Sequence, residues 1–305
     1  MAINFNQLIN SPSGVRLASQ LGSVLPPRLG YALADLIAVR ISRQPDSALV
    51  RAVQANQWVV RGENLPRSEL VSAAQNVFKH AARSTFDLYH YIHDPQSVIR
   101  RTVLDNATRQ LFERSEFDRR GLVVVGLHLS AFDLVLQALC AQGMKPLVLT
   151  IPNPQGGRQL EYEMRKRTGM NLLPASVGAM RHALQHLQKG GYVVTGIDRP
   201  ISDASSQPKF FGRPAALPTH HVFLASRAEV PVMIIVTRWG SDGKYHILTS
   251  EMIEMDSYSH RETGLLRNAE KVLSIAEQFI RQSPEQWTMT LPVWPEVLDI
   301  LRRGA

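Results

Sequence analysis

His128 and Asp133 interrupt an otherwise apolar stretch and are the residues whose types and spacing most suggest chemistry. Residues 121–140 read GLVVVGLHLSAFDLVLQALC. Burying an ionisable group is costly unless it is paired or hydrogen-bonded, so the two residues form either a satisfied core contact or a site. When a carboxylate holds one ring nitrogen of a histidine, it fixes the tautomer and raises the basicity of the other nitrogen. The chemistry indicated is general-base catalysis.

The elements around this pair would position it at the end of a strand. The β-branched run 122–127 predicts a strand that is buried on both faces. Residues 131–143 predict a helix that Gly143 ends, and the dipole of that helix favours a carboxylate in its first turn. We therefore expect Asp133 to reach back to one imidazole nitrogen of His128. The competing interpretation is a hydrogen bond that serves structure only.

A second predicted strand, 192–197, runs directly into Asp198 and Arg199. Strands alternate with helices along this part of the chain, which predicts an α/β fold with a mainly parallel central sheet flanked by helices. The carboxyl ends of parallel strands meet at one edge, where such sheets bind ligands. His128 and Asp198 are therefore expected at the same edge of the sheet.

The chain is expected to divide near residue 115. Residues 1–115 predict a helical, membrane-associating region, and 116–305 predict the α/β domain, the two packed as one compact unit. A charged linker is expected over 113–121. The helices expected before it span 14–24, 28–42, 67–93 and 96–114. After it we expect strands at 122–127, 145–150, 171–173, 192–197, 230–239 and 244–250. The last two are expected to form an antiparallel hairpin at the edge of the sheet. Helices are expected over 131–143, 157–167, 177–189, 217–228 and 263–282, and Ser176 is expected to cap the helix that follows it.

Other chemistry is less favoured by the residue pattern. Ser130 lies between His128 and Asp133, but no G-x-S-x-G elbow surrounds it, which argues against a serine nucleophile. No third ligand clusters with that pair, so no metal site is expected. His220 and His221 are adjacent and would diverge by about 100° on a helix, which favours solvated or capping roles.

Two basic segments are candidates for holding phosphate. The stretch KFFGRPAALPTH (209–220) offers Lys209 and Arg213 beside the start of a helix. The alternative is a loop with exposed charge. The stretch GGRQLEYEMRKR (156–167) adds Arg165 and other cations, some of which must face solvent.

Composition narrows the partners. Lys and Arg total 34 against 26 Asp and Glu, a formal net charge of +8, which favours anionic partners. Without long basic runs or zinc-finger spacing, a membrane surface or a phosphorylated substrate fits better than nucleic acid. Cys140 is the single cysteine and excludes an internal disulfide. No run of about 18 apolar residues predicts a transmembrane helix. The apolar segment 29–39 is expected to lie on a membrane surface or to pack on its own protein.

An ordered set of motifs resembles one known family. HLSAFD (128–133) is similar to the H-x4-D/E motif of glycerolipid-type acyltransferases. The segments that follow it extend the likeness over nearly the whole chain: YVVTGIDRP (192–200), KFFGRPAALPT (209–219), EVPVMIIVTRW (229–239) and FIRQSPEQWTM (279–289). The chain thus resembles the bacterial lipid A biosynthesis acyltransferase family, which includes the mycobacterial phosphatidylinositol mannoside acyltransferases.

The resemblance implies transfer of a fatty acyl chain from an acyl thioester, acyl-CoA or acyl-carrier protein, to a hydroxyl of a membrane glycolipid. His128 would deprotonate that hydroxyl, with Asp133 orienting it, and neither a metal nor a cofactor would be needed. The residues expected to bind substrate are Arg165, Asp198, Arg199, Lys209 and Arg213. The protein would lie peripherally on the cytoplasmic side of the inner or plasma membrane. The alternatives are a thioesterase or lipid hydrolase on the same fold, and a non-catalytic lipid-binding protein.

Three departures from the lipid A branch bear on the acceptor. Asp133 stands where that branch often has Glu, and Asp198-Arg199 stands where it has Asp-Gln-Asp. Residues 218–220 read Pro-Thr-His, where the family has Pro-Thr-Gly. These differences favour a glycolipid other than lipid A, and the Asp-Arg pair is closer to that of the mannoside-acylating branch.

Overall fold

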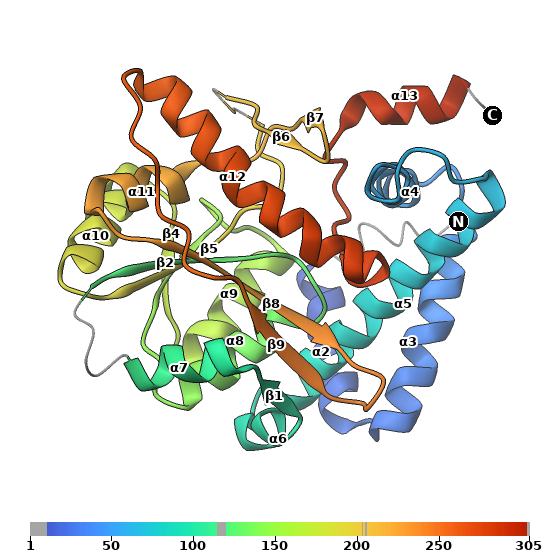
Figure 1. The fold of residues 1–305 in the computed structure, drawn as a ribbon. Helices are drawn as coiled ribbons and strands as arrows, with labels where there is room; N and C mark the ends of the chain where they lie inside the picture. The colour runs from blue at the N-terminus through green and yellow to red at the C-terminus, as the bar shows by residue number, and fades with distance from the viewer. Residues whose placement is uncertain (1–10, 115–119, 203, 205, 304–305) are drawn as a thin grey trace.

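A seven-stranded sheet forms the centre of the molecule in the computed structural model, which describes residues 11–114, 120–202, 204 and 206–303 (Figure 1). The strand order is β1-β9-β8-β2-β5-β3-β4, and every neighbouring pair is parallel except β8 and β9. This confirms the predicted α/β fold with a mainly parallel sheet. The strands of this sheet are β1 (Thr102–Leu104), β2 (Leu122–Gly126), β3 (Leu147–Thr150), β4 (Asn171–Pro174), β5 (Tyr192–Gly196), β8 (Val232–Trp239) and β9 (Tyr245–Thr249).

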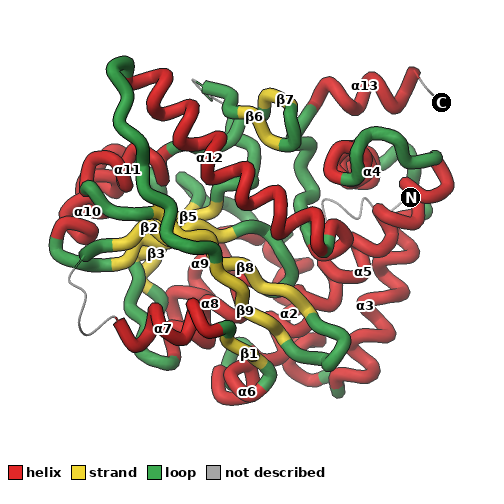
Figure 2. The backbone as a smooth tube through the Cα atoms, viewed as in Figure 1, coloured by secondary structure: helices red, strands yellow, loops and turns green. Residues whose placement is uncertain are grey.

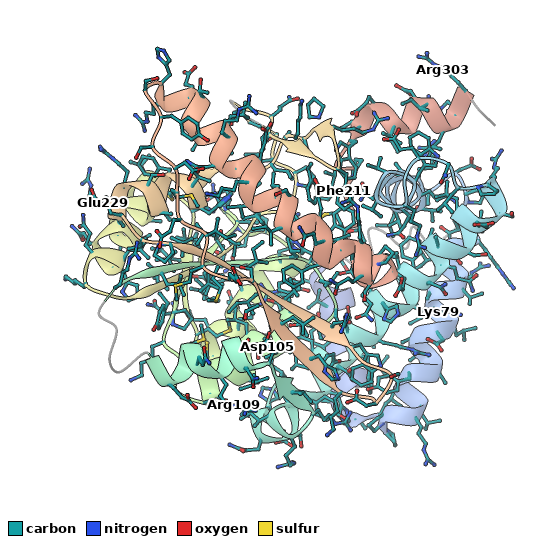
Figure 3. All side chains as sticks on the ribbon, in the orientation of Figure 1. Lys79, Asp105, Arg109, Phe211, Glu229 and Arg303 are labelled. Carbon is teal, nitrogen blue, oxygen red and sulfur yellow. The ribbon has the colours of Figure 1, made fainter. Side chains whose placement is uncertain are left out.

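Helices cover both faces of the sheet, as the β-branched strand sequences require. One face packs on α8 and α9, and the opposite face packs on α10, α11 and α12 (Figures 1 and 2). Side chains fill the space between these layers (Figure 3). A small hairpin of β6 (Lys209–Phe210) and β7 (Arg213–Pro214) lies beside α12. The helices after β2 are α8 (Phe132–Ala141), α9 (Gly157–Arg167), α10 (Val177–Gln188), α11 (His220–Ala228), α12 (Arg261–Gln282), the short 3-10 helix η1 (Pro284–Gln286) and α13 (Pro295–Arg303).

Helices α2, α3 and α4 pack mainly on the long helix α5, as Figure 1 shows in blue and cyan. Gly30 allows α3 to approach α5 closely, because a Cβ there would lie 2.1 Å from the ring of Phe86. Among the described residues, no helix has the length and apolarity needed to cross a membrane. The helices before β2 are α2 (Pro12–Val24), α3 (Pro27–Ser42), α4 (Ala48–Val60), α5 (Arg67–Tyr91), α6 (Pro95–Arg100) and α7 (Asn106–Arg114).

Two N-terminal elements join the main core. Ala55 and Val59 of α4 belong to the largest buried cluster, and the Asn56 amide donates hydrogen bonds to the carbonyls of Met289 and Leu291. Strand β1 pairs with β9 inside the sheet. The expected boundary at residues 115 and 116, and the centre of the expected linker over 113–121, lie outside the described residues.

The single helix expected over 96–114 is wrong. Strand β1 separates α6 from α7, because residues 102–104 pair with β9. Asp105 then accepts hydrogen bonds from the backbone N–H groups of Thr108 and Thr249, which ties the start of α7 to the strand (Figure 3). Tertiary pairing here overrides local helical preference.

The remaining sequence predictions differ from the structure mainly at two places. The β8–β9 hairpin is antiparallel as expected, but β1 rather than β9 forms that edge of the sheet. Helix α4 received no bounds in the sequence analysis, because its buried residues lie on more than one face and show no clear helical period. Ser176 caps α10 as predicted, with its hydroxyl accepting from the N–H of Ala179.

Candidate active site

Strands β2 and β5 bring His128 and Asp198 to one edge of the sheet. The strands run parallel, and Gly126 lies beside Gly196 at their carboxyl ends. Each ionisable residue comes two positions after its glycine, so the two side chains meet. The expectation that both strands point to a shared edge is confirmed.

Asp198 holds the imidazole of His128. Its Oδ1 lies 2.7 Å from His128 Nδ1, and its Oδ2 accepts from the His128 backbone N–H at 2.8 Å. Asp198 is fully buried, and burial alone would raise its pKa. The charge of His128 and the hydrogen bonds from His128 and Trp287 outweigh burial, so the pKa of Asp198 lies below its usual value. Asp198 is therefore an ionised acceptor at neutral pH.

An ionised carboxylate can only accept hydrogen bonds, so the hydrogen of the neutral imidazole lies on Nδ1 and Nε2 keeps its lone pair. Within the described part of the chain no side chain hydrogen-bonds Nε2. The His128 side chain is 25% exposed. This arrangement provides a base with an accessible nitrogen and a fixed tautomer.

A segment far along the chain clamps the turn that carries His128. The indole Nε1 of Trp287 donates to Asp198 Oδ2 at 2.7 Å. The backbone N–H of Thr288 donates to the His128 carbonyl at 2.8 Å, and the N–H of Ser130 donates to the Gln286 carbonyl at 2.8 Å. Sequence reasoning did not assign Trp287 to the site, although the segment 279–289 was one of the family-like motifs. The tryptophan within that motif was the available signal.

Asp133 contacts a guanidinium rather than the imidazole. Its carboxylate accepts from Arg165 at 2.5 Å, from the last turn of α9. Arg165 also lies 3.9 Å from Glu161. Burial would lower the pKa of Arg165, but these two carboxylates outweigh it and raise that pKa. The expectation that Asp133 orients His128 is corrected, because Asp198 occupies the imidazole nitrogen that an orienting acid would bind.

A cavity of about 440 Å³ opens at His128 and extends between the sheet and helices α8 and α9. Its deep part is lined by apolar side chains: Leu136, Val148, Met170, Leu172 and Val194. Gly126 and Gly196 also line it, and a Cβ on Gly196 would lie 3.8 Å from His128 Cε1. Because Gly196 lacks a side chain, the cavity remains open beside the imidazole.

Cations line the same cavity. Arg158, Arg165 and Arg199 all contribute to its wall. Burial and the neighbouring charge of Arg158 lower the pKa of Arg199 to about 10, so its guanidinium stays charged at neutral pH. Two of the expected substrate-binding residues, Arg165 and Arg199, thus share the cavity of His128.

The other expected phosphate-binding residues lie elsewhere. Arg213 forms ion pairs with Glu63 and Glu296, which join the β6–β7 hairpin to the loop after α4 and to α13. Lys209 is exposed, and its backbone N–H donates to Glu270. Neither lines the cavity of His128. Asp198, expected to bind substrate, instead binds His128 and Trp287 and is closed to solvent.

Solvated or capping roles were expected for the adjacent histidines of α11, but His221 is buried and His220 is partly buried. His220 lines the cavity and lies 2.7 Å from the Thr195 hydroxyl, and burial lowers its pKa to about 4. His221 has no exposed surface, and burial lowers its pKa to about 3. Both imidazoles are neutral at pH 7, because the α11 segment packs against β2 and β8. In the described residues no cluster of three or more potential ligands is placed to hold a metal.

Comparisons with known proteins identify the family of the chain. A family model described as bacterial lipid A biosynthesis acyltransferase matches residues 67–296, a segment that includes His128, Asp198 and Trp287. The chain is also similar to the Vi polysaccharide export protein VexE of Salmonella typhi, with 22% identity over 191 residues. That match covers 62% of this chain and 28% of VexE, so the chain spans less than a third of that relative's length. Because the family model covers well over half of it, the chain belongs to the bacterial lipid A biosynthesis acyltransferase family, whose members are acyltransferases.

Proposed function

We propose that the protein transfers a fatty acyl chain from an acyl thioester, carried by CoA or by acyl-carrier protein, to a hydroxyl of a membrane glycolipid. The observation that carries the proposal is the position of the His128 imidazole. Buried Asp198 holds its Nδ1, and the imidazole lines a cavity whose walls are largely apolar. Family membership supports acyl transfer as the reaction class.

The reaction follows from the position of Nε2. The lone pair on Nε2 takes the proton of the acceptor hydroxyl while the hydroxyl oxygen attacks the thioester carbonyl. The carbon–sulfur bond then breaks, and the departing thiolate receives the proton from the imidazolium. Asp198 stabilises the positive charge that His128 carries between these steps. The ester forms without a covalent acyl-enzyme.

The cavity between the sheet and α8–α9 suits the donor. Its apolar depth accommodates an alkyl chain, with the thioester carbonyl at its opening beside His128. Phosphate groups of the donor carrier would meet Arg158 and Arg199, and guanidinium groups bind phosphate in two-point contacts. Asp133, in this proposal, positions Arg165 in the same wall rather than contacting the imidazole.

Peripheral binding to the cytoplasmic face of the inner or plasma membrane is part of the proposal. Members of the family are membrane-associated. Exposed apolar side chains lie on the first two described helices: Leu17, Leu21 and Val24 of α2, and Leu29 and Leu36 of α3. A net charge of +8 favours the anionic lipid headgroups of that face.

His128→Ala tests the proposal directly. Purified protein would be given a radiolabelled acyl-CoA or acyl-carrier protein together with membrane glycolipids, and products would be resolved by mass spectrometry. We expect the variant to lose transfer by about 10²–10⁴-fold, the usual contribution of a general base. His182→Ala on α10 is the matched control, because His182 is exposed and outside the cavity.

Two outcomes would contradict the proposal. Acyl transfer by His128→Ala at the wild-type rate would show that His128 is not the general base. Free fatty acid as the only product, across a range of glycolipids, would indicate a hydrolase instead. Lipid profiles of cells with and without the gene then identify the acceptor as the glycolipid that loses one acyl chain.

A further inference from the structure

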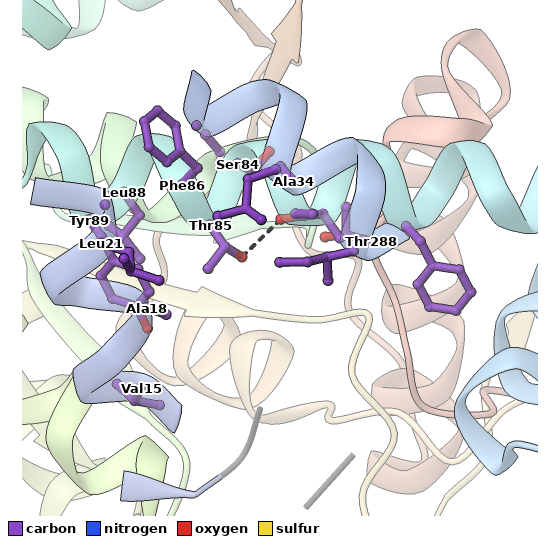
Figure 4. Close-up of a pocket in the computed structure, with 18 of the residues that line it drawn as sticks. Val15, Ala18, Leu21, Ala34, Ser84, Thr85, Phe86, Leu88, Tyr89 and Thr288 are labelled. Carbon is purple, nitrogen blue, oxygen red and sulfur yellow. Dashed lines mark hydrogen bonds between the residues drawn. The ribbon is translucent and has the colours of Figure 1, made fainter. Parts of the chain in front are cut away.

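A second cavity, of about 500 Å³, lies on the other side of the catalytic turn among the N-terminal helices (Figure 4). Its walls come from α2, α3 and α5, and Figure 4 labels Val15, Leu21, Ala34 and Leu88 among the apolar side chains there. Its inner end is formed by residues 130–134 and Thr288. This second cavity therefore reaches the same turn that carries His128.

The two cavities share their inner residues. Phe132, Asp133 and Glu161 line both of them. The ring of Phe132 packs edge-on against the imidazole of His128, with 5.0 Å between ring centroids. A molecule in the second cavity and a molecule in the sheet-side cavity would therefore both contact Phe132, whose ring lies against His128.

The charges that line the two cavities differ. The sheet-side cavity contains three arginines, whereas the charged side chains among the described lining of the second cavity are Asp133 and Glu161. Burial and the charge of Asp133 raise the pKa of Glu161, and the nearby charge of Arg165 offsets part of this increase. A phosphate-bearing donor would gain nothing from this lining, but an uncharged alkyl chain is accommodated by its apolar walls.

The outer end of the second cavity opens into the apolar surface of the first two helices. Leu17 and Leu21 line the cavity and are 52% and 41% exposed. Val24, on the same helix, is 80% exposed, and Leu36 of α3 is 66% exposed. Exposed apolar side chains of α2 therefore form part of the cavity wall, where an alkyl chain from a lipid surface could contact them.

A buried hydroxyl stands at the inner end. Ser130 lines the second cavity, is 4% exposed, and its Oγ has no hydrogen-bond partner in the described structure. Its backbone has φ of 52°, a left-handed conformation that is uncommon for serine and is held by the clamp from Gln286. An unsatisfied buried hydroxyl is costly, so a polar group of a ligand is its natural partner.

We propose that the cavity among α2, α3 and α5 binds an alkyl chain of the acceptor lipid, with Ser130 donating a hydrogen bond to the polar group that joins chain and sugar. The donor chain lies on the opposite side of the turn, in the sheet-side cavity. This assignment rests on the proposed function. It makes the acceptor a lipid whose chain leaves the membrane during the reaction, rather than a sugar presented at the surface.

Photolabelling tests the assignment without turnover. The probe is an octyl glucoside that carries a diazirine at the end of its alkyl chain, presented to the full-length protein and crosslinked by light. We expect adducts on peptides from α2, α3 and α5. Dodecanoyl-CoA in excess should leave this labelling unchanged, because the donor occupies the other cavity.

Variants that fill the cavity provide the second arm. Ala18→Leu with Ala81→Leu places two leucines in the wall, and labelling should fall by about tenfold. Thr85→Phe acts at an exposed position in the same wall, so folding is little affected. Ala32→Leu is the matched control, because Ala32 is exposed on α3 and outside the cavity.

Three results would overturn the assignment: adducts on β4 or β5, which line only the sheet-side cavity, displacement of the label by dodecanoyl-CoA, or labelling that the filling variants leave unchanged. Absence of any adduct counts against it equally. Because labelling requires no acyl transfer, a failed transfer assay and a failed labelling experiment reject different statements.

Discussion

The two aspartates near His128 have the same chemistry but opposite surroundings. Asp198 is closed to solvent and accepts hydrogen bonds from the His128 ring, the His128 backbone and the Trp287 indole. Asp133 has a side chain that is 20% exposed, at the start of α8, and it pairs with Arg165. The difference shows that strand pairing, rather than the five-residue separation along the chain, determines which aspartate contacts the His128 imidazole. A neighbouring strand supplies the orienting acid.

Asp198→Asn should reduce acyl transfer more than any other substitution considered below. A small reduction would contradict the contrast drawn between Asp198 and Asp133. The amide keeps the shape but removes the negative charge that stabilises the imidazolium and fixes its tautomer. We expect kcat for acyl transfer to fall by about 10²–10⁴-fold, the range for a disabled general base. Steady-state kinetics measures this loss, and circular dichroism confirms that the variant is folded. A loss of only a few fold would show that His128 does not depend on Asp198.

Asp133→Asn should have a smaller effect, because it removes the negative charge that pairs with Arg165 and leaves the carboxylate that binds His128 in place. Hydrogen bonds to charged groups contribute about 1.5–3 kcal/mol, so we expect a loss of roughly 10- to 100-fold in kcat/KM, mostly through KM for the donor. Glu163→Gln, on the exposed side of α9, is the control. If Asp133→Asn reduced kcat as much as Asp198→Asn, the two aspartates would act as one unit and the distinction drawn above would be wrong.

The third prediction compares histidines. His128 has a carboxylate partner, whereas burial lowers the pKa of His221 to about 3. The unfolded chain protonates His221 below about pH 6.5 and the folded chain does not, so folding stability falls as pH decreases from 7 to 5. The contribution of His221 to this decrease is about 2 kcal/mol. His221→Leu should flatten the decrease by that amount in urea unfolding at the two pH values, and an unchanged slope would contradict it.

Strand pairing was accessible from sequence, but side-chain partners across the fold were not. The β-branched runs 122–127 and 192–197 predicted buried parallel strands, and therefore the shared edge that holds His128 and Asp198. The error lay in choosing Asp133, which is near in sequence, over Asp198, which is 70 residues away. Pattern and spacing report local geometry, whereas a hydrogen bond between neighbouring strands depends on register.

The dependence on contacts between distant residues also explains which of the predicted phosphate-binding residues line the cavity. Arg165 lies in the last turn of α9 and Arg199 follows β5, and both line the cavity of His128. Arg213 pairs with Glu63, a residue 150 positions earlier that nothing in the local motif indicates. The burial of His221 likewise depends on how α11 packs against the sheet, and the adjacent pair of histidines gave no sign of it.

The clamp formed by residues 286–288 also sets the time at which the site can exist during synthesis. The bond from Trp287 to Asp198 joins residues 89 positions apart, and the bond from Thr288 to the His128 carbonyl joins residues 160 positions apart. A ribosome must therefore translate well beyond both aspartates before the base acquires its final orientation. A nascent chain that already contains His128, Asp133 and Asp198 lacks this clamp, so the site stays incomplete until residues 286–288 have been added and have folded against the turn that carries His128.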